Sequence, residues 1–293
     1  MKYNVQNIKP KYSNLEINEF DDNDQFMEAS IELLKQTIEL LWILIGIGYC
    51  DENGEPKEIS KEEAVVAGNI NRYIKLNTSF LQNICERRSE IASILSRCIG
   101  ETYVNIKYLL GNFEERVIRN YIKYSLITEK ELWNKIKENI KKRGGEAEYI
   151  EYRMNESIKR SFDKSDFLLD EVNRSSKWKS ISKRADDVAG DAFYLIFYGI
   201  SSHSVHGNWQ DVLTYHLTNS GNGFKLNLEW TQPQPQMIDA FVSMNLDLVE
   251  ALAEKFANRE IKKIKEELLN YKMNLVESHE EYLEARKNHK KVS

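Results

Sequence analysis

The 293-residue chain has few of the residues that usually mark turns, with 4 prolines and 13 glycines. Sandwiches and barrels need frequent turns between many short strands, so this composition argues against both architectures. Apolar residues make up 41% of the chain and charged residues 30%. These proportions suit long helices, and we therefore predict an all-α multi-helix bundle.

Cysteine is also scarce. Cys50, Cys85 and Cys98 are far apart, odd in number and without the spacing of metal ligands. We expect them to be reduced thiols in a cytoplasmic protein, with no metal site and no cofactor. The sequence has no P-loop, no dinucleotide-binding glycine motif, and neither an HExxH nor a GxSxG pattern.

No apolar run is long enough to predict a membrane span. The most hydrophobic stretch, residues 38–49, contains Glu39 and is shorter than the roughly 20 residues that a bilayer requires. The first twenty residues lack the apolar core of a signal peptide, so we expect neither export nor membrane association. The formal net charge of −5 disfavours indiscriminate nucleic-acid binding, although local basic patches remain compatible with it.

Three regions follow from the hydrophobic periodicity. We predict an N-terminal extension over residues 1–23, a helical core domain over 24–257 and a charged C-terminal helix over 258–293 that projects, pairs with a second copy or frays. Apolar and polar residues alternate on both sides of the turn at 219–223. This pattern predicts a β-hairpin within 210–230, with strands at 211–217 and 224–230. The remaining helices are predicted at 25–48, 60–110 with a break near Asn77, 112–143 with Asn112 as its cap, 146–172 and 237–257.

The stretch from Trp178 to Gly207 holds the most concentrated chemistry. A single helix from Asp186 onward would be apolar almost all round and central in its bundle. Gly207 is the type of residue that often follows a helix end, which places His203 and His206 in the last turn. The polar residues that would share one side of this helix are Asp187, Asp191, Tyr194, Tyr198 and Ser202.

A second candidate group lies on the helix that contains residues 96–110. Arg97, Glu101 and Tyr108 fall outside its apolar stripe. Arg97 and Glu101 either form a partly exposed ion pair or point into a cleft against the histidine helix. In the second case Arg97 would be a phosphate-binding fork and Glu101 would orient it.

The segment 174–184 carries five basic residues and no acidic one. Trp178 within it is either an anchor packed on the bundle or part of an RNA-contacting edge together with Lys179 and Arg184.

Two motifs together resemble the bacterial domain-of-unknown-function family 5677. One is the Arg-xxx-Glu helix with Arg97 and Glu101, and the other is the Tyr-x7-His segment formed by Tyr198 and His206. The resemblance covers roughly residues 71–257 and implies a helical fold without an agreed activity.

A looser similarity is to the HEPN superfamily of helical bundles, which often dimerise and include metal-independent ribonucleases of toxin and phage-defence systems. Those enzymes place an Arg a few residues before a His, and His206 fits the His position. No Arg or Lys lies between Arg184 and His206. Either Arg97 substitutes from a neighbouring helix, or the chain is not a nuclease of this kind.

These observations leave two main hypotheses. In the first, the chain is a bacterial metal-independent endoribonuclease of a toxin or phage-defence system. Its catalytic residues would be Arg97, Glu101, His203 and His206, and its RNA-binding residues Tyr108, Trp178, Lys179, Arg184, Tyr198 and Ser202. In the second, the chain is a non-catalytic sensor or protein-interaction module, because buried polar groups often only satisfy one another. RNA, a partner protein and a second copy of the chain are the expected partners.

A third alternative, a metal hydrolase, fits poorly. His203 and His206 can face one ion, but on one continuous helix Asp191 would lie about 20 Å away.

Overall fold

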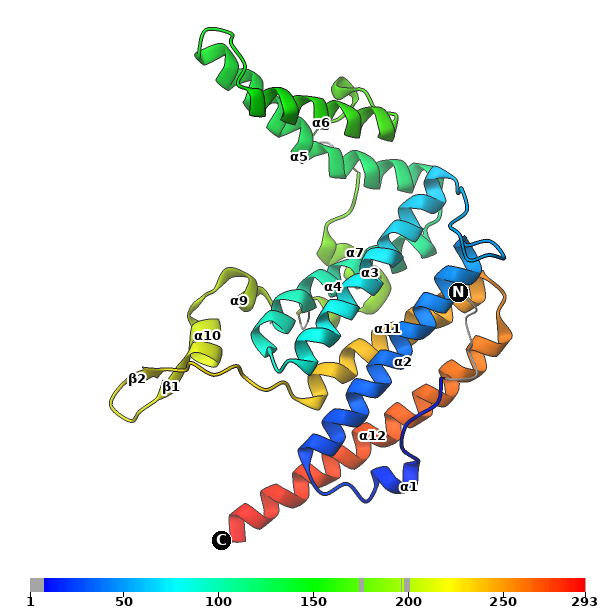
Figure 1. Cartoon of the computed structure of the whole chain (residues 1–293), viewed down its shortest axis with the longest axis vertical. Coiled ribbons are helices and arrows are strands. Elements are labelled where there is room, and N and C mark those ends of the chain that lie inside the picture. Colours follow the sequence, from blue (N-terminus) through cyan, green and yellow to red (C-terminus); the bar gives the residue numbers. More distant parts are fainter. Residues whose placement is uncertain (1–7, 174–176, 196, 198–200, 293) are drawn as a thin grey trace. The chain divides into compact units, whose positions relative to one another are not determined.

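The computed structural model describes residues 8–173, 177–195, 197 and 201–292 (Figure 1). The chain divides into two compact units, Met1–Lys107 with Ala185–Ser293 and Tyr108–Arg184. Helices dominate the described residues, and the strands described are the two of a small antiparallel hairpin. The predicted all-α class with one β-hairpin is therefore confirmed.

Helix α2 (Asn23–Tyr49) is the central element of the first unit. It begins after Asp22, whose carboxylate accepts the Gln25 N–H at 2.8 Å, and it matches the helix predicted at 25–48. Glu28, Lys35 and Glu39 form an exposed stripe along the helix, and most of its other side chains are apolar and buried. Its fully buried leucines are Leu33, Leu34, Leu40, Leu41 and Leu44.

Helices α3 (Lys61–Cys85) and α4 (Ser89–Gly111) follow as a pair. The Ser60 hydroxyl caps α3 by accepting the Glu63 N–H at 3.2 Å. The predicted break near Asn77 is wrong, because the Asn77 amide donates to the Tyr73 carbonyl inside the same helix and is satisfied there. The chain breaks instead at Arg87, which has a left-handed φ of 59°.

Helices α11 (Pro235–Lys255) and α12 (Arg259–Val292) complete the core of the first unit. Both pack against α2 and against each other, and the short α1 (Asn14–Ile17) packs on α12 (Figure 1). A buried polar chain crosses this core. The Tyr73 hydroxyl donates to Asn245 at 2.8 Å, and the Asn245 amide donates to Thr37 at 3.0 Å. These bonds satisfy polar groups that would otherwise be costly to bury.

The predicted single helix from Asp186 to His206 is wrong. Helix α7 (Ile181–Ala189) ends at Gly190, whose φ of 79° lies in the left-handed region that glycine tolerates. The short helices α8 (Asp191–Tyr194) and α9 (Ser201–His206) follow. Asp187 therefore does not share a helix with Tyr194 or Ser202, and Tyr198 lies outside the described residues.

The first predicted strand, 211–217, is largely helical. Asn208 accepts the N–H groups of Gln210 and Asp211 and so begins α10 (Trp209–Asp211). A π-helical turn, η4 (Val212–His216), continues from it. Three-residue strands then pair around Gly221, β1 (Leu217–Asn219) with β2 (Phe224–Leu226), so that Leu217 is opposite Leu226.

The second unit is a helical hairpin of α5 (Glu115–Lys142) and α6 (Tyr149–Ser165), followed by the 3-10 turn η2 (Leu169–Glu171). Gly144 and Gly145 form the predicted break between the helices, with φ values of 91° and 100°. Asn112 is not the cap of α5, because its amide donates to the Tyr108 carbonyl at the end of α4. A small apolar cluster holds the hairpin together: Leu126, Trp133, Ile136, Ile158, Phe162, Phe167 and Val172.

Candidate functional site

Helix α4 places Arg97 and Glu101 one turn apart on the same side. The Arg97 Nε donates to Glu101 Oε1 at 3.0 Å, and the side chains are 16% and 41% exposed. The carboxylate is well solvated, so the pair adds only about 0.5 kcal/mol to stability. Its main effect is to hold the guanidinium in one orientation.

The same guanidinium reaches helix α9. Arg97 Nη1 donates to the Ser202 hydroxyl at 3.4 Å, which joins two segments more than a hundred residues apart in the sequence. His206 follows Ser202 by four residues and therefore lies on the same side of α9, one turn nearer its C-terminal end. The structure thus brings together Arg97, Glu101 and Ser202, and it exposes the His206 side chain at the end of the same short helix.

His203 is held differently from Arg97 and Ser202. Asn208 Nδ2 donates to His203 Nδ1 at 2.6 Å, so the residue that caps α10 also fixes this imidazole. His203 also lines a pocket in the first unit.

This pocket, which we call the α9 pocket, has a volume of about 600 Å³. It lies among α4, Phe197, α9, α10, η4 and α11, and its walls are both aromatic and polar. A pocket of this size that combines an apolar lining with a few polar groups is typical of small-molecule sites. The residues that line it are Ser93, Ser96, Phe197, His203, Ser204, Gln210, Asp211, Thr214, Tyr215, Gln236, Met237, Ala240 and Phe241.

Gly100 allows one wall of the α9 pocket to approach α4 closely. A Cβ atom added to Gly100 would lie only 3.1 Å from Phe197 Cβ. Phe197 also packs edge-on against Phe241 of α11, with ring centroids 5.7 Å apart. The absence of a side chain at Gly100 therefore allows the Phe197 side chain to pack directly against α4.

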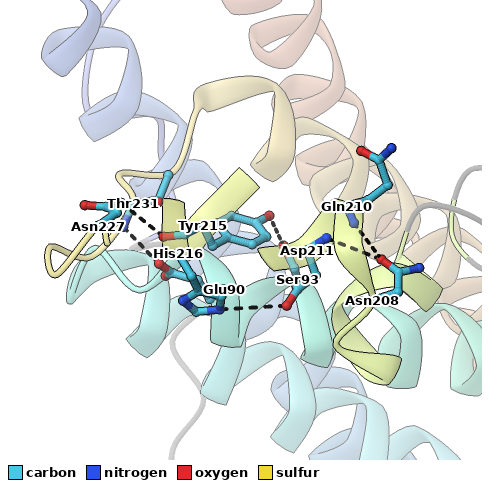
Figure 2. Close-up of polar contacts among 9 residues, drawn as sticks. All are labelled: Glu90, Ser93, Asn208, Gln210, Asp211, Tyr215, His216, Asn227 and Thr231. Carbon is cyan, nitrogen blue, oxygen red and sulfur yellow. Dashed lines mark hydrogen bonds and ion pairs between the residues drawn. The ribbon is translucent and has the colours of Figure 1, made fainter. Parts of the chain in front are cut away.

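The polar side of the α9 pocket comes from α4 and from the turn after α10 (Figure 2). The Ser93 and Tyr215 hydroxyls share a hydrogen bond of 2.8 Å. Asp211 is 9% exposed, and its Oδ2 lies 3.8 Å from His216 Nε2. Figure 2 shows these side chains converging between α4 and the segment 208–216. They form a buried carboxylate flanked by hydroxyl groups.

Asn227 holds the segment that carries Tyr215 and His216 through two hydrogen bonds to backbone carbonyls. The Asn227 side chain donates to the Tyr215 carbonyl at 3.0 Å, and its backbone N–H donates to the His216 carbonyl at 2.9 Å (Figure 2). Further along the chain, Thr231 donates its N–H to the buried Glu90 carboxylate at 3.2 Å. The segment 217–231, which we call the hairpin arm, is thus tied to the first turn of α4, close in sequence to Ser93.

The other predicted binding residues belong to the second unit. Trp178 is only 8% exposed and packs edge-on against Tyr108 and Tyr121, with ring centroids 5.3 and 5.2 Å away. The Arg184 guanidinium lies 4.5 Å from the Trp178 ring centroid, and its Nε donates to the Lys179 carbonyl at 3.0 Å. Trp178 therefore serves as a packing anchor within its unit, and Arg184 is buried against it.

Sequence reasoning did not identify Ser93, Asp211, Tyr215 or His216 as site residues. The period-two pattern of 211–217 suggested a strand, which would have sent Asp211 and Tyr215 to the same face as Leu213. The signal that could have identified a helix is Asn208, since asparagine is among the best N-cap residues.

Neither a metal cluster nor a membrane-spanning helix is found in the described part of the chain. No three or more His, Cys, Asp or Glu side chains gather there as metal ligands would, and no helix there is long and apolar enough to cross a bilayer.

Comparison with known proteins gives one match. Residues 63–224, more than half of the chain, match a family of unknown function, DUF5677, and the chain belongs to that family. The matched segment contains Arg97, His206 and Asp211. No curated protein and no solved structure matches the chain.

Proposed function

We propose that this member of the DUF5677 family is a metal-independent endoribonuclease, similar in chemistry to the HEPN enzymes and active in a bacterial toxin or phage-defence system. The observation that carries the proposal is the contact of Arg97 with Ser202 on α9. It brings a guanidinium from a different helix to the element that ends in His206. Arg97 would thereby replace the arginine that the HEPN pattern has on the histidine helix.

The chemistry needs three functions. A base removes the proton of the ribose 2′-hydroxyl, whose oxygen then attacks the adjacent phosphorus. An acid protonates the departing 5′-oxygen, and a cation stabilises the charge that builds up on the phosphorane. We assign the acid to His206 and the cation to Arg97, which Glu101 orients at 3.0 Å. We assign the base to His203, whose Nδ1 must first be released from the Asn208 amide before it can accept the proton. The products are a 2′,3′-cyclic phosphate and a 5′-hydroxyl end.

The test is incubation of the purified full-length protein with labelled single-stranded RNA in EDTA. We expect cleavage that leaves cyclic phosphate ends. His206→Ala and Arg97→Ala should each slow it roughly 100-fold to 10,000-fold, since acid–base and electrostatic groups contribute that much.

Arg259→Ala is the matched control, because Arg259 is an exposed arginine at the start of α12, outside the candidate site. It should cleave at the wild-type rate, and far-ultraviolet circular dichroism should show that all three variants keep their helices. Wild-type protein that leaves every RNA intact, or His206→Ala that cuts at the wild-type rate, would contradict the proposal.

A second candidate function is non-catalytic: the chain would sense a small ligand or bind a partner protein. What favours it is the α9 pocket, whose apolar wall of Phe197, Met237 and Phe241 resembles a ligand cavity more than an open RNA groove. A ligand that binds the folded state raises the melting temperature by mass action. A chain that never cuts RNA but is stabilised by a small molecule would support this alternative.

A further inference from the structure

Asp211 is the feature of the α9 pocket that the cleavage chemistry does not use. It is the one carboxylate among the described lining residues, and it is 9% exposed. A buried carboxylate is costly unless hydrogen-bond donors compensate it. Its neighbour His216 lies 3.8 Å away, beyond ordinary hydrogen-bond distance. A ligand that presents N–H groups would supply closer donors.

Another part of the lining is apolar and aromatic. Phe197 and Phe241 pack edge to face at 5.7 Å, and Met237 lies with them in the wall. Aromatic rings and a thioether accept the face of a planar heterocycle. The pocket therefore combines a stacking surface with an acceptor for donors at the ring edge.

We propose that the α9 pocket receives a guanine base of single-stranded RNA. This inference rests on the proposed ribonuclease function and names the nucleotide at which it acts. Guanine carries two adjacent donors, N1–H and the N2 amino group, which match the two oxygens of one carboxylate. Single-stranded RNA is commonly recognised by stacking an unpaired base and reading its Watson–Crick edge.

The other bases fit the carboxylate less well. Adenine presents the N1 acceptor next to its amino group, and cytosine presents N3 in the same way, so each would place a lone pair against Asp211. Uracil offers a single N3–H between two carbonyl oxygens. Unpaired acceptors buried against a carboxylate reject the wrong ligand strongly.

Helix α9 connects this pocket to the cleavage residues. His203 lines the pocket, and Ser202 on the same helix contacts Arg97. A base stacked against Phe197 therefore lies beside the helix that carries both histidines. We expect cleavage next to guanine for this reason.

The binding test uses the full-length protein and four nucleosides in isothermal titration. Guanosine should bind roughly 10-fold to 100-fold more tightly than adenosine, cytidine or uridine, because it makes two charge-assisted bonds. Inosine lacks the N2 amino group but keeps N1–H, so it should bind about 10-fold more weakly than guanosine.

Asp211→Asn keeps the shape of the side chain and removes one acceptor, so it should abolish the preference for guanosine. Glu229→Gln is the control, since Glu229 is exposed on the hairpin arm and the substitution changes the charge equally. Both variants should keep the wild-type circular dichroism.

Two kinds of result separate this inference from the ribonuclease proposal. RNA cleavage without guanosine preference, or a preference that survives in Asp211→Asn, would overturn the guanine pocket and leave the nuclease standing. Selective, Asp211-dependent guanosine binding by a chain that cuts no RNA would uphold the pocket and overturn the nuclease. Preferential binding of alkylammonium compounds over guanosine would overturn the inference in favour of an amine site.

Discussion

The two units of the chain are stabilised in different ways. The first unit has a deep core to which α2 contributes many fully buried side chains, and hydrogen bonds link Tyr73, Asn245 and Thr37 within it. The second unit depends on a small apolar cluster that holds two heavily charged helices together, and on the packing of Trp178 against Tyr108 and Tyr121. A rigid core can hold side chains at fixed distances, so the first unit is better suited to carry a reactive centre.

The pockets of the two units also differ in the residues that line them. The α9 pocket of the first unit has aromatic walls and one buried carboxylate. The second unit has a pocket of about 420 Å³ lined by Arg116, Arg119 and Lys123 together with Glu115 and Glu171. The lining of this pocket carries charges of both signs, whereas the α9 pocket has a single carboxylate among its described lining residues. The deep core and the pocket with a buried carboxylate therefore occur in the same unit.

The largest effect that would sharpen this comparison is expected from truncating a core phenylalanine in each unit. Phe162→Ala removes a buried ring from the apolar cluster of the second unit. Phe80→Ala removes a buried ring of the first unit, whose centroid lies 4.2 Å from that of Phe241. Each should cost about 3–5 kcal/mol.

Hydrogen exchange is the measurement for both variants. Phe162→Ala should increase exchange across α5 and α6 while α2 and α11 stay protected, because the small cluster has little else to support it. Phe80→Ala should increase exchange in the first unit. Equal loss of protection in both units in each variant would break the comparison.

A smaller effect is expected from Asp239 in the first unit. Burial raises the pKa of this carboxyl to about 6, and one of its oxygens is buried without a hydrogen-bond partner. Lys272 and Glu280 of α12 face it with opposing influences on the pKa. The folded state therefore binds the proton more tightly than the unfolded state, so the stability contributed by protonated Asp239 is lost as the pH rises from about 4 to 6.

Asp239→Asn should remove this pH dependence and raise the free energy of unfolding by about 2 kcal/mol at pH 7. Urea denaturation between pH 4 and pH 7 measures it. His279 acts with the opposite sign, since burial lowers its pKa and its contribution is lost as the pH falls below its usual range. A variant with the same pH slope as the wild type would show that Asp239 is not the cause.

The smallest effect concerns the buried polar chain. Tyr73→Phe removes the hydroxyl that donates to Asn245 at 2.8 Å and leaves that amide oxygen unsatisfied in the core. We expect a loss of about 1.5 kcal/mol in urea denaturation. Combining it with Asn245→Leu should cost less than the sum of the single changes, and strict additivity would contradict coupling between these two groups.

Much of the fold could be predicted because its signals are local. Periodicity located α2, α5, α11 and α12 to within a few residues, whereas α6 ends at Ser165, well before the predicted end at residue 172. The break predicted at Asn77 was misplaced because residue type alone does not show whether an asparagine ends a helix. The Asn77 amide donates to a carbonyl of its own helix, and the left-handed backbone occurs at Arg87. Gly190 was a visible breaker, but the apolar run around it suggested one continuous helix.

The candidate site was predictable only in part. The spacing of Arg97 and Glu101 directly predicts their ion pair on α4. The contact of Arg97 with Ser202 depends on tertiary packing across more than a hundred residues, which no local pattern encodes. Asp211 and Tyr215 were missed because alternating residues in a π-helical turn imitate a strand.

That turn gives the α9 pocket an unusual sensitivity to chain length. A π-helical turn accommodates one residue more than an α-helix over the same span, and such turns are frequent at functional sites. Deleting a single residue from 212–216 would let an ordinary α-helical turn cover the same span, so the chain beyond it would keep its direction while the residues inside the turn would face differently. The contact most sensitive to such a deletion is the hydrogen bond between the Tyr215 and Ser93 hydroxyls, because Tyr215 lies inside the turn.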